Sequence, residues 1–139
     1  MSNKKKIFII DDEKINIMAL AHILQSEYDI IVTTNSICAL EIAEKNMPDL
    51  ILLDIIMPDI SGFEVLEKLK ESKTTKHIPV IFITGLNSAE DEEKGIGLGA
   101  ADFIAKPFSK SIVKTRIETQ LKLLDYKNTI EKYEKALGI

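Results

Sequence analysis

The chain has 139 residues, of which 45% are hydrophobic and 29% charged, and its net charge is −4. This length suits a single globular domain, and the acidic balance argues against electrostatic binding to nucleic acid. No apolar run approaches the ~20 residues that span a bilayer, and the only cysteine, Cys38, excludes an intrachain disulfide, so we expect a cytoplasmic protein without membrane or nucleic-acid partners.

Short apolar runs predict five strands, at residues 7–10, 30–33, 50–53, 80–83 and 103–105. Between them, apolar residues recur at helical spacing, as in the stripe formed by Ile17, Leu20, Ala21 and Leu24. A second stripe contains Val65, Leu66 and Leu69. Strands that alternate with helices predict an α/β fold, in which helices cover both faces of a parallel sheet and the crossovers are right-handed.

Two helix starts carry capping-box patterns, Ser61 to Glu64 and Ser88 to Asp91. The glycines at 95, 97 and 99 superficially match a dinucleotide-binding loop. Such a loop follows a strand and opens a helix, whereas this one follows a helical pattern and precedes a strand. We therefore expect these glycines to end a helix and form a tight turn into the fifth strand.

The C-terminal segment predicts one long helix over residues 109–137, about 40 Å in length, with Gly138 as its stop. Its first half has an apolar stripe suited to packing on the sheet, at Val113, Ile117, Leu121 and Leu124. Its second half has the spacing of a short coiled-coil seam, at Leu123, Tyr126, Ile130, Tyr133 and Leu137. We expect a domain over residues 1–122 and a helical extension over residues 123–139, which could serve as a coiled-coil linker. We expect this extension to pair with a second copy or to relay a signal to a partner. The alternative is that it folds back on its own domain.

Polar residues follow four of the predicted strands: Asp11 and Asp12, Asp54, Thr84, and Lys106. If the strand order is 2-1-3-4-5, these groups converge at one edge of the sheet, where ligands of open α/β folds bind. Three carboxylates in one pocket repel one another unless a cation joins them, and hard oxygen ligands suit Mg²⁺.

The residue types also fit phosphoryl transfer. A carboxylate nucleophile such as Asp54 can form an aspartyl phosphate. The charge of a transferring phosphoryl group needs cations and hydrogen-bond donors, which Lys106 and Thr84 supply. Gly85 adds no side chain that would block access. We therefore interpret Asp54 as the acceptor of a phosphoryl group.

Over residues 4–122 the chain resembles the receiver domain of bacterial-type two-component response regulators. The motifs that carry the resemblance are Asp11-Asp12, Asp54-Ile55-Ile56-Met57-Pro58 with Gly62, Thr84-Gly85, and Lys106-Pro107-Phe108. The resemblance implies a flavodoxin-like, doubly wound sheet of five parallel strands. It also implies that Asp54 takes a phosphoryl group from a histidine kinase or phosphotransfer protein, and that the chain is a signalling switch and not an enzyme.

The same resemblance implies roles for the neighbouring residues. Mg²⁺ would be held by Asp12, Asp54 and the main-chain carbonyl of Ile56, with Asp11 acting through water. Lys106 would contact the phosphoryl group, and the Lys106-Pro107 peptide would be cis. On phosphorylation Thr84 would move toward the phosphate and Phe103 would turn inward. Because Phe103 lacks the hydroxyl of the tyrosine found in many relatives, packing alone would drive that change.

Two apolar residues near the acceptor, Ile56 and Leu86, should hinder an attacking water, so we expect an aspartyl phosphate that lasts minutes or longer. Ile56 also argues against a haloacid dehalogenase-type phosphatase, which needs a second acid at that place. A second alternative is a flavodoxin-like carrier of flavin mononucleotide. The acids of the first loop, Asp11, Asp12 and Glu13, argue against it because they would repel the phosphate of that cofactor. A further alternative is a stand-alone or truncated receiver used for docking or dimerisation.

Overall fold

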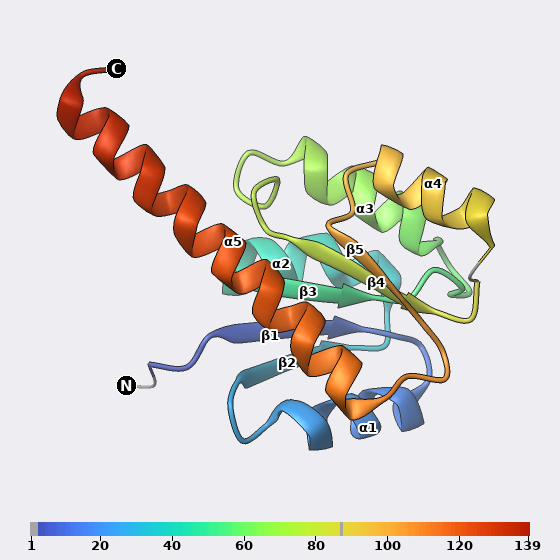
Figure 1. The fold of residues 1–139 in the computed structure, drawn as a ribbon. Helices are drawn as coiled ribbons and strands as arrows, with labels where there is room; N and C mark the ends of the chain where they lie inside the picture. The colour runs from blue at the N-terminus through green and yellow to red at the C-terminus, as the bar shows by residue number, and fades with distance from the viewer. Residues whose placement is uncertain (1–2, 87) are drawn as a thin grey trace.

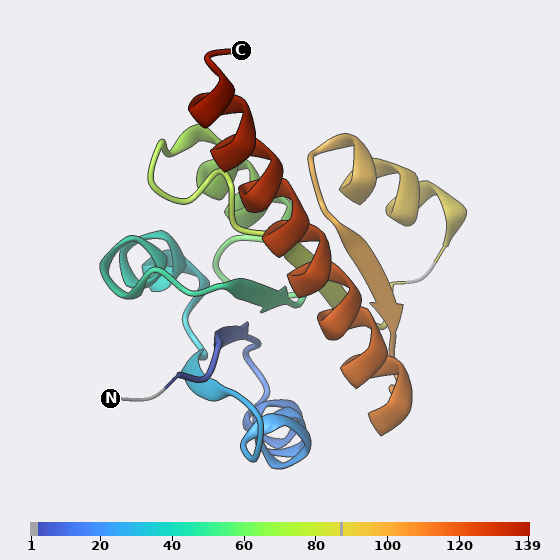
Figure 2. The ribbon, with the colours of Figure 1, turned by 60° about the vertical axis from the view of Figure 1, so that its left-hand side comes forward.

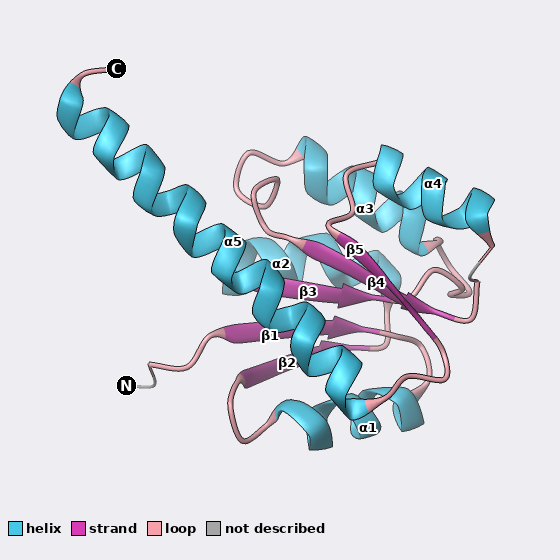
Figure 3. Ribbon diagram, viewed as in Figure 1, coloured by secondary structure: helices cyan, strands magenta, loops and turns pink. Residues whose placement is uncertain are grey.

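The computed structural model describes residues 3–86 and 88–139. Five parallel strands form one sheet in the order β2-β1-β3-β4-β5 (Figures 1 and 3). The strands are β1 (Lys6–Ile10), β2 (Asp29–Thr33), β3 (Leu50–Leu53), β4 (Val80–Thr84) and β5 (Asp102–Ala105). This confirms the predicted doubly wound α/β fold. Each predicted strand ends within one residue of the observed one, and Thr84, expected after the fourth strand, is its last residue.

Helices follow the strands and cover both faces of the sheet (Figure 1). The α-helices are α1 (Lys14–Leu24), α2 (Ala39–Asn46), α3 (Gly62–Glu71), α4 (Ala89–Gly97) and α5 (Lys110–Leu137), and a 3₁₀ helix, η1, covers Ser36–Cys38. The two serines predicted to cap helices each accept a hydrogen bond from a backbone N–H in the first turn. Ser61 Oγ accepts the N–H of Glu64 at 3.4 Å, and Ser88 Oγ accepts that of Asp91 at 3.2 Å.

The core has two layers because successive strand residues point to opposite faces. In β1, Ile7 and Ile9 belong to the cluster with α1 and α5, whereas Phe8 and Ile10 belong to the cluster with α2 and α3. All four residues are fully buried. Burial on both faces explains why the strands read as continuous apolar runs and not as alternating ones.

The glycine-rich segment behaves as predicted only in part. Gly99 takes a φ of 107° in the turn before β5, which suits glycine. Gly95 lies inside α4, where a Cβ would stand 3.0 Å from ring atoms of Phe82. The sequence interpretation of Gly95 as a helix-ending residue was therefore wrong. Its role is to let α4 approach β4 closely.

Helix α5 is a single helix that packs on the sheet with its first half and projects beyond the domain with its second (Figures 1 and 2). Val113, Ile117 and Leu121 are buried, as predicted. The predicted seam residues beyond them are exposed, from 53% at Leu123 to 73% at Leu137. The helix does not fold back on its own domain. Among residues 3–86 and 88–139, every helix is too short or too polar to span a bilayer.

Candidate functional site

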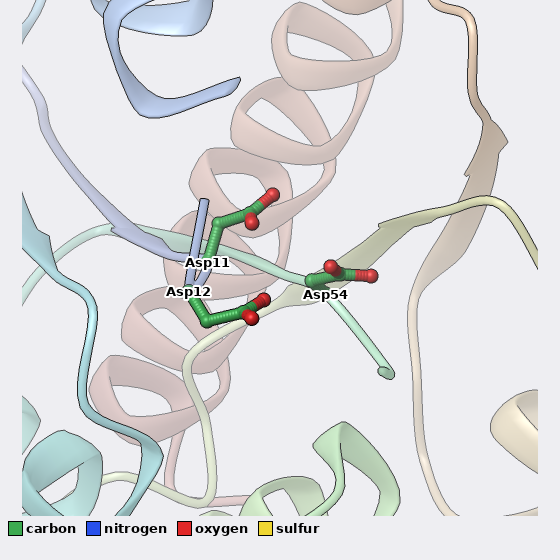
Figure 4. A group of neighbouring side chains, drawn as sticks. All are labelled: Asp11, Asp12 and Asp54. Carbon is green, nitrogen blue, oxygen red and sulfur yellow. The ribbon is translucent and has the colours of Figure 1, made fainter. Parts of the chain in front are cut away.

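Three carboxylates meet at the C-terminal edge of the sheet. Asp11 and Asp12 follow β1 and Asp54 follows β3, and these two strands are hydrogen-bonded neighbours. One carboxylate oxygen from each residue lies within 4.8 Å of the others. Figure 4 shows the three side chains around one common space. The structure therefore brings together the acids that the sequence placed at separate strand ends.

Lys106 joins two of these acids from the end of β5. Its Nζ lies 2.9 Å from Asp11 Oδ2 and 3.2 Å from Asp54 Oδ2. Both carboxylates are buried, with Asp11 inaccessible and Asp54 4% exposed. Burial by itself lowers the pKa of Lys106, but the hydrogen bonds and negative charges of Asp11 and Asp54 outweigh it and raise that pKa. The lysine is therefore held as a cation.

The backbone fixes the remaining oxygens of the two buried acids. Asp54 Oδ1 accepts the N–H of Ile55 at 2.8 Å, and Asp11 Oδ1 accepts the N–H of Glu13 at 2.9 Å. In each carboxylate, one oxygen therefore accepts a hydrogen bond from the backbone of its own loop, and the other accepts one from Lys106. Asp54 is oriented before any ligand arrives.

Gly62 brings α3 against the same loop. Its N–H donates to the Ile55 carbonyl at 2.8 Å. A Cβ at this position would lie 2.1 Å from the Asp54 carbonyl oxygen, so no side chain fits without movement of the backbone. Gly62 therefore helps to position the loop that carries Asp54.

Thr84 is the last residue of β4, the strand that pairs with β3, and its hydroxyl bonds to its own loop. The side chain is buried, and Oγ1 accepts the N–H of Leu86 at 3.3 Å. The Thr84 carbonyl accepts the N–H of Lys106 at 2.9 Å, which ties the ends of β4 and β5 together. A Cβ on Gly85 would meet nothing within 4 Å, in agreement with the predicted open access.

Phe103 is already buried in this structure, at 7% exposure. Its ring centroid lies 5.8 Å from that of Phe82, which lies 5.5 Å from Phe63. Lys94 of α4 stands 4.4 Å above the Phe63 ring. This aromatic row was not predicted, because it joins side chains from three separate elements. The predicted cis peptide between Lys106 and Pro107 is present.

The acid cluster fits a hard divalent cation. Carboxylate oxygens are hard ligands of the kind that Mg²⁺ prefers. One such oxygen from each of Asp11, Asp12 and Asp54 lies within 4.8 Å of the others, so the three could share one ion. Asp12 is less buried than the other two, which leaves that side of the cluster open to water.

Exposed apolar side chains occur in the segments that follow the acids, and the sequence analysis did not identify all of them. Ile56 follows Asp54 by two residues and is 58% exposed. On α1, Ile15 is 72% and Met18 is 70% exposed. Both lie outside the buried face formed by Ile17, Leu20 and Leu24, and that offset from the helical stripe was the available signal.

Comparisons with known proteins match most of the chain. The model of the response regulator receiver domain matches residues 7–118. A probable cyclic di-GMP phosphodiesterase of Vibrio cholerae is 44% identical over 115 residues, which are 83% of this chain and 26% of that protein. The polar-differentiation response regulator DivK of Brucella anthropi is 38% identical over 106 residues, covering 76% of this chain and 86% of DivK.

Among solved structures, a CheY-like response regulator receiver domain protein of Methanospirillum hungatei matches with a TM-score of 0.84 and 27% identity. The match covers 90% of this chain and 99% of that one. The chain thus spans about a quarter of the length of the Vibrio relative and most of the length of DivK.

Proposed function

Because the chain belongs to the response regulator receiver domain family, we propose that it is a signalling switch whose phosphoacceptor is Asp54. The observation that supports this assignment best is the bridge of Lys106 between Asp54 and Asp11. It holds a carboxylate nucleophile and a cation together at a sheet edge. Among the three acids, only Asp54 both follows the central strand and contacts Lys106.

The proposed transfer is a displacement at phosphorus. A carboxylate oxygen of Asp54 forms the new O–P bond while the P–N bond of a phosphohistidine breaks, and the imidazole takes up a proton as it leaves. Lys106 offsets negative charge on the phosphoryl oxygens. Thr84 Oγ1 accepts one hydrogen bond from Leu86 and can still donate its own hydrogen to a phosphoryl oxygen.

We propose that Mg²⁺ binds at the acids, with Asp12, Asp54 and the Ile56 carbonyl as ligands and Asp11 acting through water. When bound, the ion would neutralise charge on the phosphoryl oxygens during transfer. The close spacing of the three carboxylate oxygens supports this assignment.

The phosphodonor is proposed to be a histidine kinase or phosphotransfer protein that docks over the site. Ile15 and Met18 of α1, the helix that follows Asp11 and Asp12, and Ile56, which follows Asp54, offer exposed apolar surface. Exposed apolar groups beside a polar centre are typical of protein–protein contacts. The projecting half of α5 is proposed to carry the signal onward and to pair with a second copy of the chain.

Incubation with a small phosphodonor, followed by mass spectrometry of the intact protein, tests this proposal. The wild type is expected to gain one phosphoryl group when Mg²⁺ is present and to lose that ability when a chelator is added. Asp54→Asn removes the nucleophile with little change in shape and should gain nothing. An unmodified wild type would favour the alternative of a docking or dimerisation module.

A further inference from the structure

The projecting part of α5 presents an exposed apolar row at coiled-coil spacing. We name it the α5 seam, and it consists of Leu123, Tyr126, Ile130, Tyr133 and Leu137. Each of these side chains is at least 53% exposed. In Figures 1 and 2 the helix leaves the domain along this segment. An apolar row of this kind normally packs against another helix.

The charges beside the α5 seam can identify that helix. Each heptad of a coiled coil has two core positions. The residue just before the first core position and the residue just after the second flank the seam, and they contact the flanking residues of the partner helix. Here Lys122 precedes Leu123, Lys127 follows Tyr126, and Glu134 follows Tyr133. The seam therefore has positive flanks near the domain and a negative one farther out.

A second observation shows a concentration of positive charge near the base of the seam. Lys70 of α3 is partly buried and donates from Nζ to the carbonyls of Lys76 and Ile78, at 3.0 and 3.2 Å. Burial lowers the pKa of Lys70, and the nearby charge of Lys127 lowers it further. Within the described residues, neither Lys70 nor Lys127 forms an ion pair. An acidic group beside Lys127 would relieve this repulsion.

We propose that the α5 seam binds a second copy of this chain in antiparallel orientation, with Ile130 of one copy opposite Tyr133 of the other. This inference rests on the proposed function, in which the helix pairs with a second copy. The alignment sets Tyr126 opposite Leu137, so apolar side chains face each other along the overlap. It also brings Glu134 of each copy beside Lys127 of the other, in two symmetry-related ion pairs.

The other alignments bring like charges together. A parallel pair would set Lys122 of one copy against Lys127 of the other. In that orientation the residue before the first core position of a heptad faces the partner residue after the second core position. An antiparallel pair shifted by one heptad would set Lys127 against Lys127. Both add repulsion close to Lys70. The proposed alignment alone supplies an acid there.

The surface near Lys127 can receive the end of a second helix. A small hollow of about 190 Å³ lies between α5 and the segment before β4, lined by His77, Pro79, Gln120, Leu123, Leu124 and Lys127. In the proposed alignment the last turn of the second copy arrives beside this hollow. The apolar side chains of Leu123 and Leu124 can then contact the last turn of the second copy.

Charge reversal in the full 139-residue chain tests the alignment, with the dissociation constant of the dimer measured by analytical ultracentrifugation. Lys127→Glu and Glu134→Lys should each weaken the dimer about tenfold, because two attractive pairs become repulsive. The double variant restores opposite charges and should return to within about threefold of the wild type. Lys132→Glu makes the same charge change away from the seam and should have no effect.

Several results would overturn the proposal. In a parallel dimer Lys127→Glu would pair with Lys122 and strengthen association, and Glu134→Lys would change little. A wild type that stays monomeric at millimolar concentration, with circular dichroism confirming an intact helix, would reject the seam as an interface. An equal effect of Lys132→Glu would also reject it. Phosphorylation by a small phosphodonor should be unchanged in all variants, so failure of pairing and failure of the phosphoacceptor role are distinguished.

Discussion

At the scale of single residues, we expect Ile56 to hinder the approach of water to Asp54, the proposed phosphoacceptor. Ile56 is exposed and lies two residues after Asp54, and it has no group that could hold an attacking water. We predict that Ile56→Asn shortens the lifetime of the aspartyl phosphate about tenfold, which corresponds to about 1.4 kcal/mol of barrier. Mass spectrometry at intervals after removal of the phosphodonor measures the lifetime.

Met18→Asn is the control for this change, because it replaces an exposed apolar residue on α1 and should leave the lifetime unaltered. The wild-type phosphate is expected to last minutes or longer. A wild-type lifetime of seconds would contradict the role given to Ile56.

Lys106 has a structural effect as well as a proposed chemical one. Lys106→Met keeps most of the side-chain volume but leaves Asp11 and Asp54 buried without their shared cation. We predict a loss of about 2 kcal/mol in the free energy of unfolding and at least a tenfold slower phosphorylation. Urea denaturation and the phosphodonor assay measure the two effects.

Added Mg²⁺ should recover part of the lost stability of Lys106→Met, since the ion supplies positive charge at the same acids. Lys114→Met is the matched control, because the exposed pair of Lys114 and Glu27 should contribute less than about 0.5 kcal/mol. Equal stability of the two variants would argue that the bridge adds nothing to the fold.

At the scale of elements, the start of α3 depends on the absence of a side chain at Gly62. We predict that Gly62→Ala lowers the free energy of unfolding by about 1–3 kcal/mol and slows phosphorylation, because the new Cβ collides with the Asp54 carbonyl. Gly97→Ala is the contrasting change. It adds a methyl group to open space in α4 and should stabilise the protein by about 0.5 kcal/mol. Thermal and urea denaturation of both variants test the pair.

The elements differ in how well the sequence predicts them. The strands were found because burial on both faces makes each one a continuous apolar run. Helix α2 was predicted only from the alternation of strands and helices and without a stripe of its own, since its buried residues are only Ala39 and Ala43. The residue types of the site were predicted from the strand ends. The bridge by Lys106 and the contact of Gly95 with Phe82 were not, because they depend on how separate elements pack.

At the scale of the whole molecule, the domain and the projecting half of α5 should be separable. The last buried residue of α5 is Leu121, and the residues beyond it are half-buried or exposed. We predict that a chain ending at Lys122 folds with nearly the wild-type midpoint of urea denaturation and is phosphorylated on Asp54, but no longer dimerises. A chain that unfolds or precipitates when shortened would show that the extension belongs to the domain.

The unbroken course of α5 has a mechanical consequence. No proline or glycine interrupts the helix between Lys110 and Leu137, so it can act as a stiff lever fixed at Val113, Ile117 and Leu121. From Leu123 to the end, the free arm is about 22 Å long at about 1.5 Å per residue. A tilt of about 5° at the fixed end would carry the tip through about 2 Å. Small rearrangements under the helix are therefore enlarged at its far end.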